Sequence, residues 1–322
     1  REIGEEEVLI NEVPLRVQLV AGCYLVENGT TADPDTVIKR ARTGLFAAVT
    51  ANVFFKFYDP KSDQQTAARV KLIAKVRSGL EKNQFELFYQ PKVSLQTGRH
   101  AGSEALLRWF DAHGNLILPG LFMPKLESTS LIDPVTRFVI ARACRDIKSE
   151  GLAASSINFA VKNLMDPDLI SQMGSMVSSY GVDPGLLEIE ITEGALIQDP
   201  IKARHSVESL RNQGFKVSLD DFGTGYSSFQ YLSNLPLTGL KIDRAFVTPL
   251  QTSADARTVL RSMIRMAHAL DLEVTVEGVE TPEQREMVSD FGADMVQGYL
   301  IARPLPVPDY VKWSKEYLPS AK

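Results

Sequence analysis

Short apolar runs alternate with amphipathic stretches from about residue 85 to the end of the chain. The apolar runs end in polar residues, a pattern that predicts buried β-strands. Between most of them apolar residues recur at helical spacing, as in 134–151 and 256–271, which predicts α-helices. The predicted strands are FELFYQP (85–91), AGSEALLRW (101–109), SINFAVK (156–162), LLEIEIT (186–192), KVSLDD (216–221), GLKID (239–243), EVTVEGVE (273–280) and DMVQGYL (294–300).

This alternation of eight strands with helices, over roughly 240 residues, is typical of an α/β fold of the (β/α)8 TIM-type barrel class. A doubly wound parallel sheet is the alternative fold. The first two predicted strands are separated by a short polar segment and have the pattern of a hairpin. The first strand is therefore expected to run antiparallel to the others.

The N-terminal part of the chain contains fewer elements. It has a strand-like run (15–26), a helical stretch (33–51) and a short strand (53–59). These elements are too few to form a stable hydrophobic core of their own. Apolar positions at helical spacing then predict a linker helix. The expected parts are a small N-terminal α+β segment at 1–62, a linker helix at 63–84 and the barrel at 85–322.

Composition narrows the functional classes. The chain has 322 residues, is 44% hydrophobic and carries a net charge of -5, so neither disorder nor a DNA-binding surface is indicated. Two distant cysteines, Cys23 and Cys144, fit a reducing cytoplasm, and four scattered histidines disfavour a His/Cys zinc site. No apolar run reaches the roughly 18 residues of a membrane span. We expect the chain to be a cytoplasmic piece of a longer protein. Any membrane anchor is expected in a region upstream of this sequence.

Side chains able to bind a metal or transfer a proton recur where the predicted strands end. In a barrel these strand ends converge on one mouth. Helix capping explains any single position about as well, but caps favour Ser, Thr, Asp and Asn, whereas this set also contains glutamates, a lysine and a glutamine. Crowded carboxylates repel one another, and all-oxygen ligands suit Mg²⁺ or Mn²⁺, with Ca²⁺ as an inhibitory competitor. The set is Glu104, Asn158, Glu190, Glu193, Asp220, Asp221, Lys241, Asp243, Glu277, Glu280 and Gln297.

Two further features stand near these strand ends. Arg108 has the chemistry to grip a phosphate or to pair with a barrel carboxylate, and both interpretations stay open. The segment 222–228 follows the adjacent carboxylates Asp220 and Asp221 and contains two glycines. We expect it to form a mobile loop.

Six motifs in sequence order carry a resemblance to a known family. SEALLRW, LEIEITE, LDDFGTGYSS, LKIDRAF, VEGVET and VQGYLIARPLP resemble the EAL-domain cyclic-di-GMP phosphodiesterases from about residue 67 to the end. The resemblance implies a barrel with an antiparallel first strand and hydrolysis of cyclic-di-GMP to linear pGpG. It also implies two Mg²⁺ or Mn²⁺ ions per site, inhibition by Ca²⁺, and a homodimer formed through the barrel.

The resemblance also implies roles for individual residues. Lys241 would orient the attacking water, Glu277 would act as general base or as a partner of the second metal, and Glu193 would anchor the DFGTG loop. The implied metal ligands are Glu104, Asn158, Glu190, Asp220 (bridging) and Asp221. The implied substrate contacts are Gln90, Leu106, Arg108, Asp243, Glu280 and Gln297.

Residues 1–62 resemble the latter part of a GGDEF (diguanylate cyclase) domain but lack its signature. We therefore expect this segment to regulate, or to be a remnant, rather than to synthesise cyclic-di-GMP. The main alternative function for the barrel is a cyclic-di-GMP receptor that hydrolyses little and signals by conformation. An unrelated metal-dependent barrel lyase is disfavoured, because it would not place DFGTGYSS beside EAL.

Overall fold

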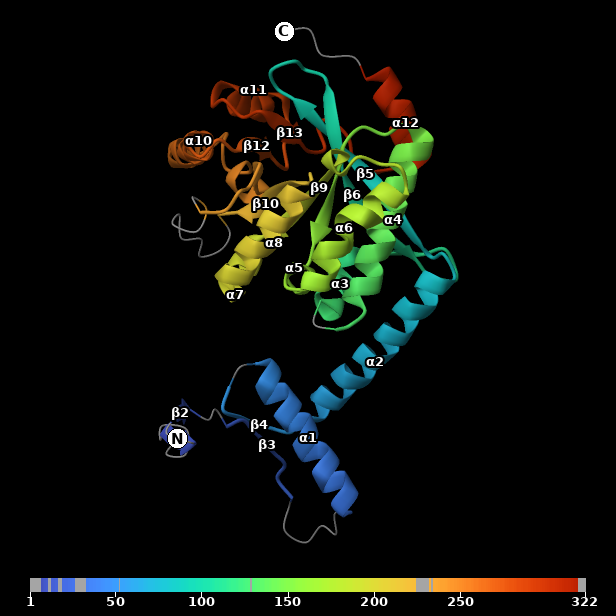
Figure 1. The fold of residues 1–322 in the computed structure, drawn as a ribbon, viewed down its shortest axis with the longest axis vertical. Helices are drawn as coiled ribbons and strands as arrows, with labels where there is room; N and C mark the ends of the chain where they lie inside the picture. The colour runs from blue at the N-terminus through green and yellow to red at the C-terminus, as the bar shows by residue number, and fades with distance from the viewer. Residues whose placement is uncertain are drawn as a thin grey trace. The chain divides into compact units, whose positions relative to one another are not determined.

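The computed structural model describes residues 7–10, 13–16, 19–26, 33–51, 53–127, 129–223, 232 and 234–317. Its contacts divide the chain into two compact units, Arg1–Val76 and Arg77–Lys322. The boundary falls inside the continuous helix α2 (Pro60–Glu81), which covers most of the predicted linker (Figure 1). The three-part division of the chain at 62 and 84 stays a prediction.

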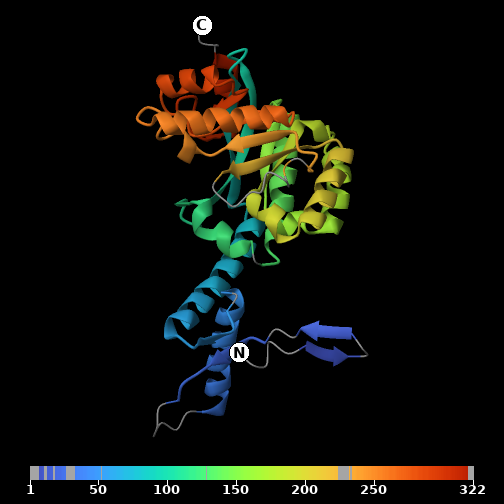
Figure 2. The ribbon, with the colours of Figure 1, turned by 90° about the vertical axis from the view of Figure 1, so that its left-hand side faces the viewer.

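The N-terminal unit contains two small sheets. β1 (Glu7–Ile10) and β2 (Val13–Arg16) form an antiparallel pair, seen as two blue arrows in Figure 2. β3 (Ala21–Cys23) and β4 (Phe55–Phe57) are parallel and are connected by α1 (Pro34–Thr50) in a βαβ unit. The strand-like run at 15–26 is therefore not one strand, because β2 ends at Arg16 and β3 begins at Ala21.

The C-terminal unit is a closed barrel. Its ring strands are β5 (Phe85–Ser94), β6 (His100–Phe110), β8 (Ser155–Phe159), β9 (Leu187–Thr192), β10 (Lys216–Phe222), β11 (Gly239–Ile242), β12 (Glu273–Val276) and β13 (Met295–Gln297). Each pairs with the next in this order, and β13 returns to β5. β5 is antiparallel to both β6 and β13, whereas every other adjacent pair in the ring is parallel. The barrel with an antiparallel first strand is confirmed, and the doubly wound alternative is wrong.

Helices cover the outside of this barrel, and α4, α8 and α10 pack on β8, β10 and β12 (Figure 1). Side chains alternate along each strand, so apolar residues such as Ile189 and Val217, both 0% exposed, form the layer under the helices. The helices of this unit are α3 (Pro119–Leu126), α4 (Ile132–Glu150), α5 (Val161–Leu164), α6 (Pro167–Ser179), α7 (Glu193–Gln198), α8 (Pro200–Asn212), α10 (Ala254–Ala269), α11 (Pro282–Asp290) and α12 (Val307–Glu316). The remaining short elements are β7 (Leu116–Ile117), β14 (Leu305–Pro306), η2 (Pro184–Leu186) and η3 (Arg244–Phe246).

Four strands end earlier than the sequence predicted. β11 stops one residue early at Ile242, and β13 stops three residues early at Gln297. β8 stops at Phe159 because Ala160 is the N-cap of the short helix α5, which begins at Val161. β12 stops at Val276, so Glu277 and Glu280 lie in the loop before α11 rather than in a strand. Within the described part of the chain, no helix combines the length and apolar character needed to cross a bilayer.

Candidate active site

A buried lysine lies among four carboxylates inside the barrel. Lys241 of β11 is only 2% exposed, and its neighbours come from four different chain segments. Their number and closeness make this cluster the strongest concentration of charge in the described barrel. Lys241 Nζ lies 2.6 Å from Glu277 Oε1, 2.7 Å from Glu190 Oε2, 3.1 Å from Asp220 Oδ1 and 3.4 Å from Glu104 Oε2.

Glu104 of β6 is surrounded by donors. Its Oε1 accepts a hydrogen bond from Asn158 Nδ2 (2.7 Å), and its Oε2 accepts one from Gln297 Nε2 (2.8 Å). Gln297 Nε2 also donates to Gln90 Oε1 (3.1 Å), which connects β13, β5 and β6 across the barrel. Gln297 Oε1 is buried and accepts no hydrogen bond from the described residues, so it is an oxygen with capacity for a further partner.

Burial and neighbouring charges shift the pKa values of Asp220, Glu277 and Glu190. Burial, together with the charges of neighbouring carboxylates, raises the pKa of Asp220 to about 8 and that of Glu277 to about 7. Burial also disfavours the charge of Glu190, but the ammonium groups of Lys241 and Lys92 outweigh it and lower its pKa to about 2. The cluster therefore holds more acidic groups than its lysines can neutralise, and added positive charge would be favourable there.

The adjacent carboxylates Asp220 and Asp221 are separated by a local irregularity of the strand. The register of β10 against β11 shifts between Leu219 and Phe222, and Asp221 has a left-handed backbone with φ of 53°. Asp221 N donates to Asp220 Oδ1 at 2.9 Å. Partial loss of contact with solvent at its carboxylate, together with the nearby charge of Asp243, raises the pKa of Asp221. Asp220 is buried, whereas Asp221 is exposed, so the bulge gives two neighbouring carboxylates different surroundings.

Glu193 ties the segment after β10 to the barrel. It is the first residue of α7, is 4% exposed, and accepts a hydrogen bond from Gly223 N at 2.8 Å. Gly223 has φ of 94°. An added Cβ there would lie 2.6 Å from the Phe246 ring, so glycine is required. The rest of the predicted loop at 222–228 lies outside the described residues.

A cavity of about 170 Å³ opens over the cluster. It contains four of the residues assigned to substrate by the sequence: Gln90, Leu106, Glu280 and Gln297. It also contains Arg244 and Tyr299, which sequence reasoning missed, although each lies within a recognised motif, LKIDRAF and VQGYL. The cavity therefore places polar and aromatic side chains next to the carboxylates.

Two residues assigned to substrate do not line this cavity. Arg108 Nη1 donates to the backbone oxygen of Leu107 at 2.9 Å, and its guanidinium lies 5.6 Å from the Phe88 ring centroid. It forms no ion pair with a carboxylate of the described chain. Asp243 accepts a hydrogen bond from Ala245 N at 2.8 Å and caps η3, so the capping interpretation describes its contact in this structure.

The oxygen chemistry of the site fits Mg²⁺ or Mn²⁺, since carboxylate and amide oxygens are available without thiolate or imidazole ligands. In the described ranges, no three His, Cys, Asp or Glu side chains are spaced as a ready-made metal cluster, and Lys241 Nζ lies between the carboxylates. Glu104, Asn158, Glu190, Asp220 and Asp221 remain the predicted ligands.

Comparison with known proteins identifies the barrel. A family model described as the EAL domain matches residues 73–304. The chain belongs to the EAL-domain family. The family match begins at residue 73, so the GGDEF-like character of residues 1–62 stays a prediction.

This EAL chain is similar in sequence to curated proteins and in fold to solved structures. It is 34% identical to the cyclic di-GMP phosphodiesterase NbdA of Pseudomonas aeruginosa over 267 residues, which cover 81% of this chain and 34% of NbdA. It is 33% identical to the PaMucR phosphodiesterase solved as a c-di-GMP complex, with a TM-score of 0.70 over 74% of this chain and 99% of the other. The EAL enzyme Bd1971, solved with cAMP and cyclic-di-GMP, is 28% identical, with a TM-score of 0.75 over 88% of this chain and 77% of that one. The chain spans about a third of the length of the curated relatives that it matches.

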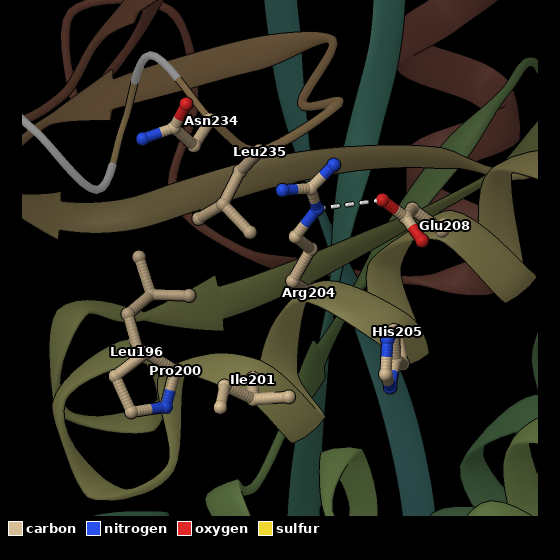
Figure 3. A pocket seen from close by; sticks show the side chains of 8 residues that line it. All are labelled: Leu196, Pro200, Ile201, Arg204, His205, Glu208, Asn234 and Leu235. Atoms are coloured by element: carbon tan, nitrogen blue, oxygen red, sulfur yellow. Dashed lines mark hydrogen bonds and ion pairs between the residues drawn. The ribbon is translucent and has the colours of Figure 1, made fainter.

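A larger cavity of the EAL unit, of about 350 Å³, lies away from these carboxylates (Figure 3). Its apolar wall contains Leu196, Ile201 and Leu235, and its polar side contains Arg204 and Glu208. Arg204 Nε is already paired with Glu208 Oε1 at 2.7 Å. Because its charges satisfy each other and no carboxylates converge there, this cavity lacks the features expected of a hydrolytic site.

The loop that carries Glu277 depends on a glycine of the EAL barrel. Gly278 has φ of 67°, and an added Cβ would lie 2.2 Å from Arg244 Cβ. Gly278→Ala is expected to displace the loop and to destabilise the protein by about 1–3 kcal/mol. Thermal unfolding measures this cost. The control is Gly120→Ala, where an added Cβ meets nothing within 4 Å. Equal melting temperatures of the two variants would contradict the prediction.

Proposed function

We propose that the EAL barrel hydrolyses cyclic-di-GMP to linear 5′-pGpG with two Mg²⁺ or Mn²⁺ ions. The observation that carries this proposal is the convergence of Glu104, Glu190, Asp220 and Glu277 around one buried lysine beneath an open cavity. The phosphodiesterase named among the relatives and the cyclic-di-GMP complexes of similar structures support the choice of substrate.

The metal ions would be held by Glu104, Asn158, Glu190, Asp220 and Asp221. When bound, two divalent ions lower the pKa of a shared water and offset the charge of the substrate phosphate. Asp220 would be one of these ligands because it is buried in the cluster, with its Oδ1 3.1 Å from Lys241 Nζ.

The remaining groups act on the water and on the substrate. Lys241 has a fixed ammonium group within hydrogen-bond distance of three carboxylates, and it would orient the attacking water. Glu277 would accept the proton of that water as it attacks phosphorus in line with the leaving 3′-oxygen. Gln90, Leu106, Glu280 and Gln297 would contact the dinucleotide from the cavity wall. Arg108 and Asp243 would contact it from outside that wall.

Two parts of the proposal concern assembly. The parallel βαβ unit of β3, α1 and β4 supports the proposal that residues 1–62 are a degenerate GGDEF-like segment with a regulatory role. A homodimer through the barrel is proposed from the family resemblance alone.

Hydrolysis is expected only with the divalent ions present. Incubating the purified chain with cyclic-di-GMP should give pGpG with Mg²⁺ or Mn²⁺, and chelation by EDTA should abolish the product, because the proposed reaction depends on divalent ions to lower the pKa of the attacking water. Ca²⁺ in place of Mg²⁺ is expected to give little product. Chromatography of the reaction measures both nucleotides. Tight binding of cyclic-di-GMP without pGpG would instead favour the receptor hypothesis.

A further inference from the structure

A second buried lysine lies beside the carboxylate cluster. Lys92 of β5 is 3% exposed and is not part of the cavity wall. Its Nζ lies 2.9 Å from Glu190 Oε1 and 3.2 Å from Glu188 Oε2. Sequence reasoning assigned it no role, because a lysine directly after proline at 91 has the appearance of a strand end. In the structure β5 continues to Ser94, so Lys92 is inside the strand.

The barrel makes room for this ion pair. Glu188 and Glu190 are two residues apart on β9, so they share one face of the strand. An added Cβ at Gly239 would lie 3.5 Å from Glu188 Oε1, so the carboxylate of Glu188 lies directly beside β11. Barrel interiors are usually filled with branched apolar side chains, so charged residues at this level need a specific reason.

Lys92 and Lys241 divide the two oxygens of Glu190 between them. Oε1 is bound by Lys92 at 2.9 Å, and Oε2 lies 2.7 Å from Lys241 Nζ. The terminal torsion of a glutamate side chain is soft, so one contact alone would leave the carboxylate plane poorly fixed. Two charged donors on different oxygens define both its position and its orientation.

We propose that Lys92 is a positioning residue, which holds Glu190 Oε1 so that Oε2 is the oxygen offered to the metal ions. This inference rests on the proposed function in one respect, namely that Glu190 is a metal ligand. Lys92 itself touches neither substrate nor metal in this scheme. It acts as the outer partner of a ligand, a role whose loss typically weakens metal binding by about 10- to 100-fold.

A purely structural role makes a different prediction. If Lys92 only balanced the charges of Glu188 and Glu190, then removing one of those charges should compensate for its loss. Lys92→Met combined with Glu188→Gln tests this. The double variant has no uncompensated negative charge at position 188, but it still has no ammonium group to donate to Glu190. Glu188→Gln alone is the matched control, since it keeps the contact between Lys92 and Glu190.

The experiment measures Mn²⁺ binding to metal-free protein by calorimetry, without substrate, together with the melting temperature. Lys92→Met is expected to weaken Mn²⁺ binding at least tenfold, whereas Glu188→Gln should stay within about threefold of the wild type. The double variant should melt at a higher temperature than Lys92→Met but should bind Mn²⁺ as weakly. Should Lys92→Met fail to fold, the affinity of the double variant decides.

Mn²⁺ affinity of the double variant within threefold of the wild type would overturn the positioning role. Unchanged affinity in Lys92→Met would do the same. Wild-type protein that binds Mn²⁺ but forms no pGpG would refute the proposed hydrolysis while leaving this inference to be judged on Mn²⁺ binding. Wild-type protein that binds no Mn²⁺ would overturn both.

Discussion

Glu104→Gln is expected to reduce the rate of cyclic-di-GMP hydrolysis by at least about 100-fold, beyond the loss typical of an outer partner of a metal ligand. Glu104 accepts hydrogen bonds from Asn158 on one oxygen and from Gln297 on the other, and Lys241 lies 3.4 Å from the second. All of these groups are donors. The substitution replaces one of the two acceptor oxygens with an NH₂ group, which is itself a donor. Whichever way the new amide is turned, its NH₂ group therefore faces another donor.

The measurement is the rate of pGpG formation at saturating Mg²⁺ and again over a range of Mn²⁺ concentrations. The matched control is Glu273→Gln, at the exposed start of β12, which should retain the wild-type rate. The proposed role of Glu104 would be refuted by a variant that folds normally and retains most of its Mg²⁺-dependent rate.

Lys241→Met is expected to abolish hydrolysis. It is also expected to lower the melting temperature of the metal-free protein, with part of the loss restored by metal ions. The change removes the cation that lies within 3.1 Å of Glu190, Asp220 and Glu277, although Glu190 keeps its contact with Lys92. Leaving buried charge uncompensated typically costs about 3–5 kcal/mol, which corresponds to a fall in melting temperature of about 6–20 °C for a domain of this size.

Thermal unfolding in EDTA and in Mn²⁺ measures this effect. Part of the lost melting temperature should return with Mn²⁺, because ions that bind only the folded state stabilise it by mass action. The control, Lys216→Met, changes an exposed lysine at the start of β10 and should melt like the wild type. A Lys241→Met variant as stable as the wild type in EDTA would show that the carboxylates need no fixed counter-charge.

Much of this barrel was predictable because its pattern is local. The alternation of apolar runs and helical stretches gave the number and order of the ring strands, and the hairpin pattern gave the direction of the first strand. The N-terminal run at 15–26 was misjudged because continuous hydrophobicity does not reveal that one strand ends at Arg16 and another begins at Ala21.

The site was harder to predict, because its geometry depends on how strands are staggered around the ring. Sequence placed Lys241 among the strand-end residues but could not show that one ammonium group meets carboxylates from β6, β9, β10 and the loop after β12. Lys92 was missed because proline at 91 concealed the length of β5. Asp243 has the contact of an ordinary helix cap within the chain, and its contact with substrate stays a prediction.

The reversed direction of β5 has a consequence for where the chain enters the barrel. Phe85, at the beginning of β5, is paired with Trp109 near the carboxyl end of β6, and Gln84 O accepts a hydrogen bond from Phe110 N. The carboxyl ends of the parallel strands form the mouth, so the residues directly after α2 meet the barrel at the rim of this mouth. If all eight strands were parallel, the chain would instead arrive at the closed end. The last turn of α2 is therefore joined to the rim of the barrel and not to its opposite end.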